Sequence, residues 1–188
     1  MRSEKIFLHH FEPFSYSNGP GCRAVIWTQG CSLRCAGCYN QQTHPFRKDN
    51  PVSIDHLIEK IYHIQDKIEG ITISGGEPFD QQESLLQLLI RIKELKNLSI
   101  IVFTGYRWQE LTHFIHFPLS VSLIDVLITG RYEPSSNASN IGLIQPHKTY
   151  YFLTNRYNKA NLTNVPSAEI WIDHAGEIIL SGTNPIVW

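Results

Sequence analysis

Three cysteines within eight residues constrain this chain more than any other feature of its sequence. Cys31, Cys35 and Cys38 stand in the order C-x3-C-x2-C, so one short loop must fold in a way that turns three thiols toward a common centre. A closed structural zinc site takes four protein ligands, whereas a site built for chemistry leaves a coordination position empty. Three thiols therefore favour a reactive metal centre, such as a cubane iron–sulfur cluster in which one iron has no protein ligand.

Two alternative interpretations of these thiols stay open at this point. Cys22 lies nine residues before Cys31 and could supply a fourth ligand to a structural zinc ion, although only Cys35 and Cys38 have the C-x2-C spacing that zinc sites use in pairs. A disulfide is disfavoured because residues 1–10 carry several charges and a short apolar run, unlike a secretory signal. We expect a cytoplasmic protein, since a reducing compartment keeps thiols for metals or catalysis.

Length and composition narrow the classes of protein that fit. The 188 residues predict a single domain, 1–188, that is large enough to bury a hydrophobic core. With 42% hydrophobic and 18% charged residues, the chain has the composition of a soluble globular protein. Its net charge of −1 and scattered basic residues argue against a nucleic-acid partner. No run approaches the length of a membrane span, so we expect no membrane partner.

Short β-branched runs alternate with amphipathic helical segments along the chain. The expected strands are 24–29, 71–74, 98–104, 123–129 and 149–153, the expected helices are 54–68, 80–95 and 108–117, and 168–172 with 177–180 are expected to form a hairpin. Ser53 is the predicted N-cap of the first helix, and Asp80 with Glu83 resembles a capping box for the second. This alternation predicts an α/β fold with a mostly parallel sheet.

A second motif, Gly75-Gly76-Glu77-Pro78, follows a predicted strand and precedes a predicted helix. Glycines let a ligand approach the backbone closely and permit positive φ, and Glu77 offers an anionic acceptor for an ammonium group. On its own the string is also what an ordinary strand-to-helix turn contains. Because functional loops follow the carboxyl ends of parallel strands, we expect this turn to lie beside the cysteine loop and the loop at 104–107.

Together, the two motifs resemble the signature of the radical S-adenosylmethionine (SAM) superfamily, in which C-x3-C-x2-C is followed by a Gly-Gly-Glu motif. The strings SNGPGCR at 17–23 and WTQGC at 27–31 resemble glycyl-radical-enzyme activating enzymes, and CYN at 38–40, FTGY at 103–106 and LIDVLI at 123–128 are similar to the anaerobic ribonucleotide reductase activating proteins. The resemblance covers residues 15–133. Asn18 and Arg23 belong to the first string and are expected near the site, although Asn-Gly-Pro-Gly is also common in turns.

The resemblance implies a fold and a mechanism. The fold is a partial, open β/α barrel of about six mostly parallel strands with a C-terminal hairpin. Cys31, Cys35 and Cys38 would ligate a [4Fe-4S] cluster, and the amino and carboxylate groups of SAM would chelate the fourth iron. Residues 75–77 would hold the methionine amino end. One electron would then cleave the sulfonium bond and give methionine and a 5′-deoxyadenosyl radical, which abstracts a hydrogen atom.

Four further residues are candidates for contact with SAM. Gly37 stands where many superfamily members carry an aromatic residue near the adenine, so Tyr39 is the substitute candidate, although its ring could simply pack. Thr104 and Tyr106 follow a predicted strand and are expected to contact SAM. Arg131 is the candidate for its carboxylate, with an exposed loop arginine as the alternative. No residue is singled out as a catalytic acid or base.

The resemblance identifies the chain as a radical SAM oxidoreductase of the glycyl-radical-activating type. Its expected partners are a glycyl radical enzyme as protein substrate and a flavodoxin- or ferredoxin-type reductant, under anaerobic conditions. Two other functions stay open. The same chemistry could act on a small molecule or a ribosomal peptide, or the chain could be a zinc-binding interaction module without catalysis.

Overall fold

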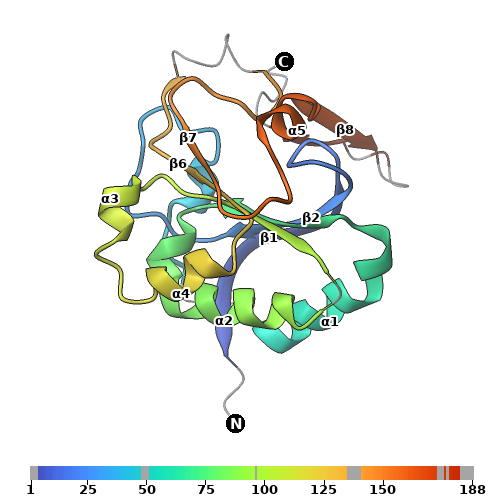
Figure 1. The fold of residues 1–188 in the computed structure, drawn as a ribbon, viewed down its shortest axis with the longest axis horizontal. Helices are drawn as coiled ribbons and strands as arrows, with labels where there is room; N and C mark the ends of the chain where they lie inside the picture. The colour runs from blue at the N-terminus through green and yellow to red at the C-terminus, as the bar shows by residue number, and fades with distance from the viewer. Residues whose placement is uncertain are drawn as a thin grey trace.

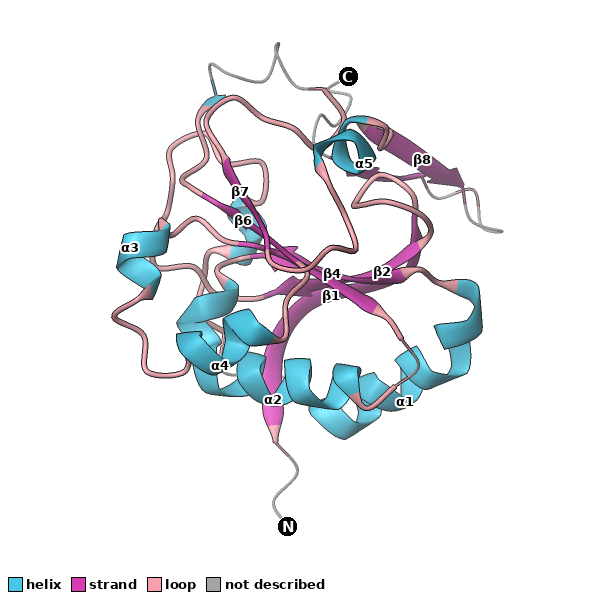
Figure 2. Cartoon of the chain, viewed as in Figure 1, coloured by secondary structure: helices cyan, strands magenta, loops and turns pink. Residues whose placement is uncertain are grey.

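A seven-stranded sheet is the centre of the computed structural model, which describes residues 4–47, 51–95, 97–134, 141–172, 176 and 178–182 (Figure 1; Figure 2). Its strands are β1 (Lys5–Ser15), β2 (Arg23–Thr28), β3 (Pro51–Ser53), β4 (Gly70–Gly75), β5 (Ser99–Phe103), β6 (Val126–Thr129) and β7 (Thr149–Phe152). A hairpin consists of β8 (Ala168–Ile172) and β9 (Ile178–Gly182). The α-helices are α1 (Ile54–Ile64), α2 (Gln82–Lys93), α3 (Trp108–Leu111), α4 (Phe117–Ser122) and α5 (Lys159–Thr163), and the short 3-10 helices are η1 (Gln41–Thr43), η2 (Gln65–Lys67) and η3 (Pro78–Gln81).

The strand order in the sheet is β3-β1-β2-β4-β5-β6-β7. Strands β2, β4, β5 and β6 are parallel to their neighbours within this group, whereas β1 and β3 at one side and β7 at the other pair antiparallel. The α/β class, the parallel centre and the C-terminal hairpin are thereby confirmed. A barrel is not confirmed, because the sheet runs from β3 to β7 without closing among the described strands.

Most expected elements lie within a few residues of their predicted positions. Ser53 is the N-cap of α1, since its hydroxyl accepts the His56 N–H. The helix expected at 108–117 is wrong in extent, because the chain forms two short helices, α3 and α4, instead. Strands β1 and β3 were not predicted, and residue 177 of the expected hairpin lies outside the described residues.

The strands are apolar on both faces because both faces of the sheet are covered. In β5, Ile100 and Val102 belong to the large core between the sheet and α1, α2 and α4. Ile101 belongs instead to a smaller cluster with Leu162 of α5. Successive side chains of a strand point to opposite faces, so this alternation follows from strand geometry. In Figure 1, α1, α2 and α4 lie below the sheet, and α5 with the hairpin lies above it.

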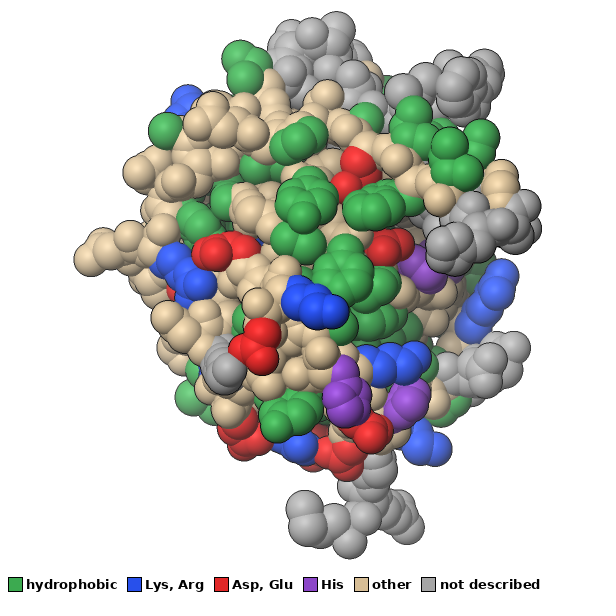
Figure 3. Space-filling view, turned by 90° about the vertical axis from the view of Figure 1, so that its right-hand side faces the viewer, with side chains coloured by type: hydrophobic (Ala, Val, Ile, Leu, Met, Phe, Trp, Pro, Cys, Tyr) green, Lys and Arg blue, Asp and Glu red, His purple; other side chains and the backbone are tan. Residues whose placement is uncertain are grey.

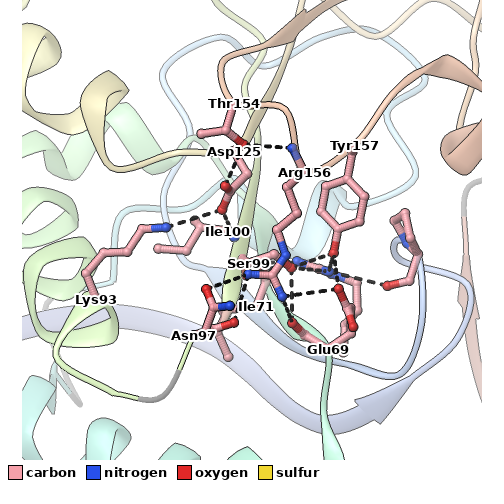
Figure 4. A network of polar contacts seen from close by, with 12 residues as sticks. Glu69, Ile71, Lys93, Asn97, Ser99, Ile100, Asp125, Thr154, Arg156 and Tyr157 are labelled. Carbon is pink, nitrogen blue, oxygen red and sulfur yellow. Dashed lines mark hydrogen bonds and ion pairs between the residues drawn. The ribbon is translucent and has the colours of Figure 1, made fainter.

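Buried polar groups hold together the edge at which β2, β4 and β5 begin, here called the amino edge. Arg23 is fully buried, and its guanidinium donates to Thr72 Oγ1 at 2.8 Å and to Ser99 Oγ at 2.8 Å. Figure 4 shows part of this network, in which the Tyr157 hydroxyl donates to Glu69 Oε1 at 2.8 Å. The segments that meet there are far apart in the sequence, so this network fixes their relative positions.

The opposite edge, here called the carboxyl edge, is where β2, β4, β5 and β6 end. The cysteine loop, the Gly75–Glu77 turn, the loop at 104–107 and the segment at 130–134 follow these four strands in turn. Figure 3 shows the face at the right of Figure 1, where hydrophobic side chains gather in the upper half. No helix in the described ranges is long and apolar enough to cross a membrane.

Candidate metal and cofactor site

A cavity of about 450 Å³ lies at the carboxyl edge of the parallel strands. The cysteine loop, the turn at 75–77 and Thr104 with Gly105 line it, together with side chains of β1 and the end of β9. Its volume falls within the range that is typical of small-ligand and cofactor sites. The loops that the sequence placed at this edge therefore meet around one space.

Most of the predicted site residues line this cavity. They are Cys31, Cys35, Cys38, Tyr39, Gly75, Gly76, Glu77 and Thr104. Tyr106 and Arg131 are not part of the lining. The Tyr106 hydroxyl donates to Asp80 Oδ1 at 2.8 Å, and Arg131 Nη2 lies 2.7 Å from Glu110 Oε1. These two side chains support the wall from behind, and their direct contact with SAM stays a prediction.

The cysteine loop is held by backbone hydrogen bonds and by tight turns. Cys31 N–H donates to His44 O at 3.1 Å, and Cys38 N–H donates to Cys35 O at 3.3 Å. Gly37 has a φ of 70°, and a Cβ there would lie 2.9 Å from Pro134 Cγ. The residue before the third cysteine must therefore be glycine for the loop to take this path, which explains why no aromatic ring stands there.

The thiols are partly removed from water, and backbone amides point at two of them. Burial raises the pKa of the Cys31 thiol, while the N–H groups of Arg34 and Leu33 act in the opposite direction. Burial likewise raises the pKa of Cys38, against the Asn40 N–H. Hydrogen bonds to the sulfurs and limited solvent exposure are two of the means by which proteins set the reduction potential of an iron–sulfur cluster. The loop therefore fits a cluster ligand set.

Cys22, the candidate fourth ligand, lies apart from the other three cysteines. Cys22 is not part of the cavity lining and packs against the hydrophobic core. All four cysteines are free thiols. Within the described ranges, no three His, Cys, Asp or Glu side chains are placed to hold a single metal ion. A cluster does not require this, because each cysteine binds a different iron atom.

The two glycines of the turn at 75–77 are required by the close approach of the backbone at the end of β2 and the start of the cysteine loop. A Cβ on Gly76 would lie 2.2 Å from Gly30 O, and one on Gly75 would lie 2.6 Å from Thr28 N. The Gly76 N–H donates to Thr28 O and the Glu77 N–H donates to Gly30 O, both at 2.8 Å. These glycines were expected to admit a ligand close to the backbone, whereas the structure shows close approach of the neighbouring backbone.

Glu77 is buried, and its carboxylate already accepts hydrogen bonds from the protein. Thr104 Oγ1 and Gly105 N–H donate to it at 2.8 Å, and Phe79 N–H donates at 3.0 Å. Burial raises the pKa of this carboxyl to about 7. A carboxylate has about four acceptor positions, so roughly one remains for a donor inside the cavity. An ammonium group there would favour the ionised form.

Lys148 is a lining residue that the sequence analysis missed. Burial lowers the pKa of its ammonium to about 8, against the attraction of Cys35, Glu77 and Cys38. Its Nζ donates to Gly130 O, the residue after β6. Lys148 reaches this place because it precedes β7, which pairs antiparallel with β6. Only the antiparallel pairing brings it there, and no local sequence signal marks such a pairing.

The hairpin and the segment at 15–18 meet beside the cavity. Asn18 lines it, as expected, and its side-chain amide donates to Ser181 Oγ of β9 at 2.7 Å. Glu169 of β8 accepts the Tyr16 N–H at 2.9 Å and the Ser17 hydroxyl at 2.8 Å. Arg23, expected near the site, lies instead at the amino edge.

The chain was compared with a family model, with other protein sequences and with solved structures. A family model described as a 4Fe-4S single cluster domain matches residues 17–144. The anaerobic ribonucleoside-triphosphate reductase-activating protein of Escherichia coli K12 is 34% identical over 130 residues, which cover 66% of this chain and 83% of that protein. The protein of the same name from Enterobacteria phage T4 is 31% identical over 125 residues, covering 64% and 78%. The crystal structure of QueE from Escherichia coli matches with a TM-score of 0.44 and 20% identity over 54% of this chain and 53% of that one.

Proposed function

The chain belongs to the 4Fe-4S single cluster domain family and to the family of anaerobic ribonucleoside-triphosphate reductase-activating proteins, and from this premise we propose that it generates a glycyl radical on a partner enzyme. It is a radical SAM oxidoreductase with a [4Fe-4S] cluster and SAM as cofactors. One observation supports the proposal most: three thiols, the turn at 75–77 and the half-buried Lys148 line the same cavity.

Cys31, Cys35 and Cys38 are the proposed cluster ligands. They are the thiols that line the cavity, whereas Cys22 lies outside it. Backbone N–H groups directed at Cys31 and Cys38 stabilise negative charge on their sulfurs, and partial burial keeps water away. When bound, the cluster and SAM together supply the reductive cleavage of the sulfonium carbon–sulfur bond, which gives methionine and a 5′-deoxyadenosyl radical.

The charges of the cavity match those of an amino acid. Glu77 is the proposed acceptor for the ammonium of SAM, as the sequence suggested. Lys148, rather than Arg131, is the cation in the lining and the better candidate for the carboxylate, because Glu110 already pairs with Arg131. Tyr39 lines the cavity with its ring edge-to-face against Tyr132 at 5.2 Å, so either ring offers a surface to the adenine.

The proposed protein substrate must bring its glycine to this cavity from outside the chain. Side chains of β1 and the end of β9, with Asn18, stand around the cavity, so the substrate segment would contact them on its way in. A flavodoxin- or ferredoxin-type protein is the proposed electron donor, since each cleavage consumes one electron.

Anaerobic reconstitution tests this function. The protein should bind about four irons per chain and cleave SAM when reduced with dithionite. With a glycyl radical enzyme added, it should produce a glycyl radical signal in electron paramagnetic resonance. Cys35→Ala should abolish cleavage, and Cys22→Ala is the matched control that should retain it.

Three results would contradict the proposal at different levels. A colourless protein with one zinc would remove the enzyme function altogether. Cleavage retained by Cys35→Ala would refute the ligand assignment. Turnover of a small molecule or a ribosomal peptide, with no glycyl radical on any partner enzyme, would show that the enzyme acts on that class of substrate instead.

A further inference from the structure

Asp80 binds the start of the cysteine loop, although its sequence position resembled a helix cap. Its Oδ2 accepts the Ser32 N–H at 2.6 Å, and its Oδ1 accepts the Ser32 hydroxyl at 3.0 Å. The capping-box expectation is thereby wrong, because α2 begins at Gln82 and the carboxylate turns toward the loop instead. Ser32 follows Cys31 directly, so Asp80 holds the backbone at the first cysteine.

Tyr106 contacts both Asp80 and Ser32. Its hydroxyl donates to Asp80 Oδ1 at 2.8 Å and lies 2.9 Å from the Ser32 hydroxyl. The ring is fixed between Phe114, at a centroid distance of 5.0 Å, and the Arg131 guanidinium at 5.2 Å. The loop after β5 therefore presents a rigid hydroxyl to the cysteine loop.

We propose that Asp80, Ser32 and Tyr106 form a clamp that positions the first cysteine of the cluster loop and places a negative charge beside the cluster. None of these three side chains belongs to the cavity lining, so they act through Cys31 and are positioning residues. The inference rests on the proposed function, because it assumes that Cys31 carries a cluster. It also gives Tyr106 a role that does not require direct contact with the cofactor.

The clamp has two physical consequences. A carboxylate beside the cluster disfavours the reduced, more negative state, so Asp80 lowers the reduction potential. Charge-assisted hydrogen bonds to the loop also oppose its local opening. Each such bond is worth enough to change an opening equilibrium by about tenfold, and somewhat less at an exposed residue such as Ser32.

The test compares variants of anaerobically reconstituted protein without substrate. In Asp80→Asn, which keeps the size of the side chain and removes its charge, the cluster potential should shift to more positive values in a redox titration followed by electron paramagnetic resonance. Loss of iron to a chelator should also become about five- to tenfold faster. Tyr106→Phe and Ser32→Ala should accelerate iron loss by smaller factors than Asp80→Asn does. They should also shift the reduction potential of the cluster less.

Matched controls are Glu83→Gln, an exposed carboxylate of α2, and Tyr62→Phe, an exposed tyrosine of α1, and both should behave as wild type. A wild-type potential in Asp80→Asn, together with wild-type iron loss in all three clamp variants, would overturn the clamp. If Asp80→Asn fails to fold, Tyr106→Phe and Ser32→Ala decide the question through iron loss. Failure of the wild-type protein to bind a cluster would instead refute the proposed function and is visible before any variant is made.

Discussion

Each edge of the parallel sheet holds a basic side chain, and the two edges satisfy its charge in opposite ways. At the amino edge, Arg23 donates to Thr72, Ser99 and backbone carbonyls, so the protein itself satisfies the charge. At the carboxyl edge, Lys148 donates one hydrogen bond among the described residues, to Gly130 O. The Lys148 side chain also lines the cavity that the thiols and Glu77 line. The first arrangement stabilises the fold, whereas the second leaves binding capacity for a ligand.

Stability and function are therefore separated along the strands. Burial lowers the pKa of the fully buried Arg23 guanidinium and of the half-buried Lys148 ammonium alike. The difference lies in the number of acceptors that the fold provides. Removing either cation should reveal which edge supports folding and which supports ligand binding.

The largest expected effect is at the amino edge. Arg23→Met should lower the free energy of unfolding by about 3–5 kcal/mol, because it leaves several buried acceptors without a donor. Denaturant unfolding measures this, with Arg47→Met at an exposed position as the control. An unchanged midpoint in Arg23→Met would mean that this network does not hold the strands together.

A pH effect of intermediate size should come from Glu77. Burial raises the pKa of this carboxyl from its ordinary 4.5 to about 7, so the folded protein binds the proton more tightly than the unfolded chain does. The free energy of unfolding of the cluster-free protein should therefore fall as pH rises from about 4.5 to 7, by about 3 kcal/mol from this group. Glu77→Gln should lose that dependence. Equal pH profiles for the two proteins would contradict the raised pKa.

The smallest effect on stability, but a clear one on binding, is expected for Lys148→Met. Its Nζ contributes little to folding, so unfolding should stay within about 1 kcal/mol of wild type. Affinity of the cluster-loaded protein for SAM should fall by about ten- to a hundredfold, the value of a charge-assisted hydrogen bond. Arg131→Met serves as the comparison and should weaken SAM binding less. If Arg131→Met weakens SAM binding more than Lys148→Met does, Arg131 is the residue that binds the SAM carboxylate.

The sequence pattern alone was sufficient to predict elements whose signal comes from neighbouring residues. The β-branched run of β2, the apolar stripe of α1 and the Ser53 cap each depend on residues that are neighbours in the sequence, so the sequence was enough to place each of them. The cysteine spacing and the Gly75–Glu77 turn also identified the chemistry and the edge at which it lies.

Contacts between distant segments decided the rest. The antiparallel pairing of β7 with β6 brings Lys148 to the cavity, and the Asp80 carboxylate accepts two hydrogen bonds from Ser32 in place of the expected helix cap. The amino acid sequence by itself placed the cysteine loop, the Gly75–Glu77 turn and the loop at 104–107 directly after three successive strands of the parallel sheet. The tertiary structure alone decided which charged groups face the cavity and which support it from behind, because burial and hydrogen-bond partners are set by residues far away in the chain.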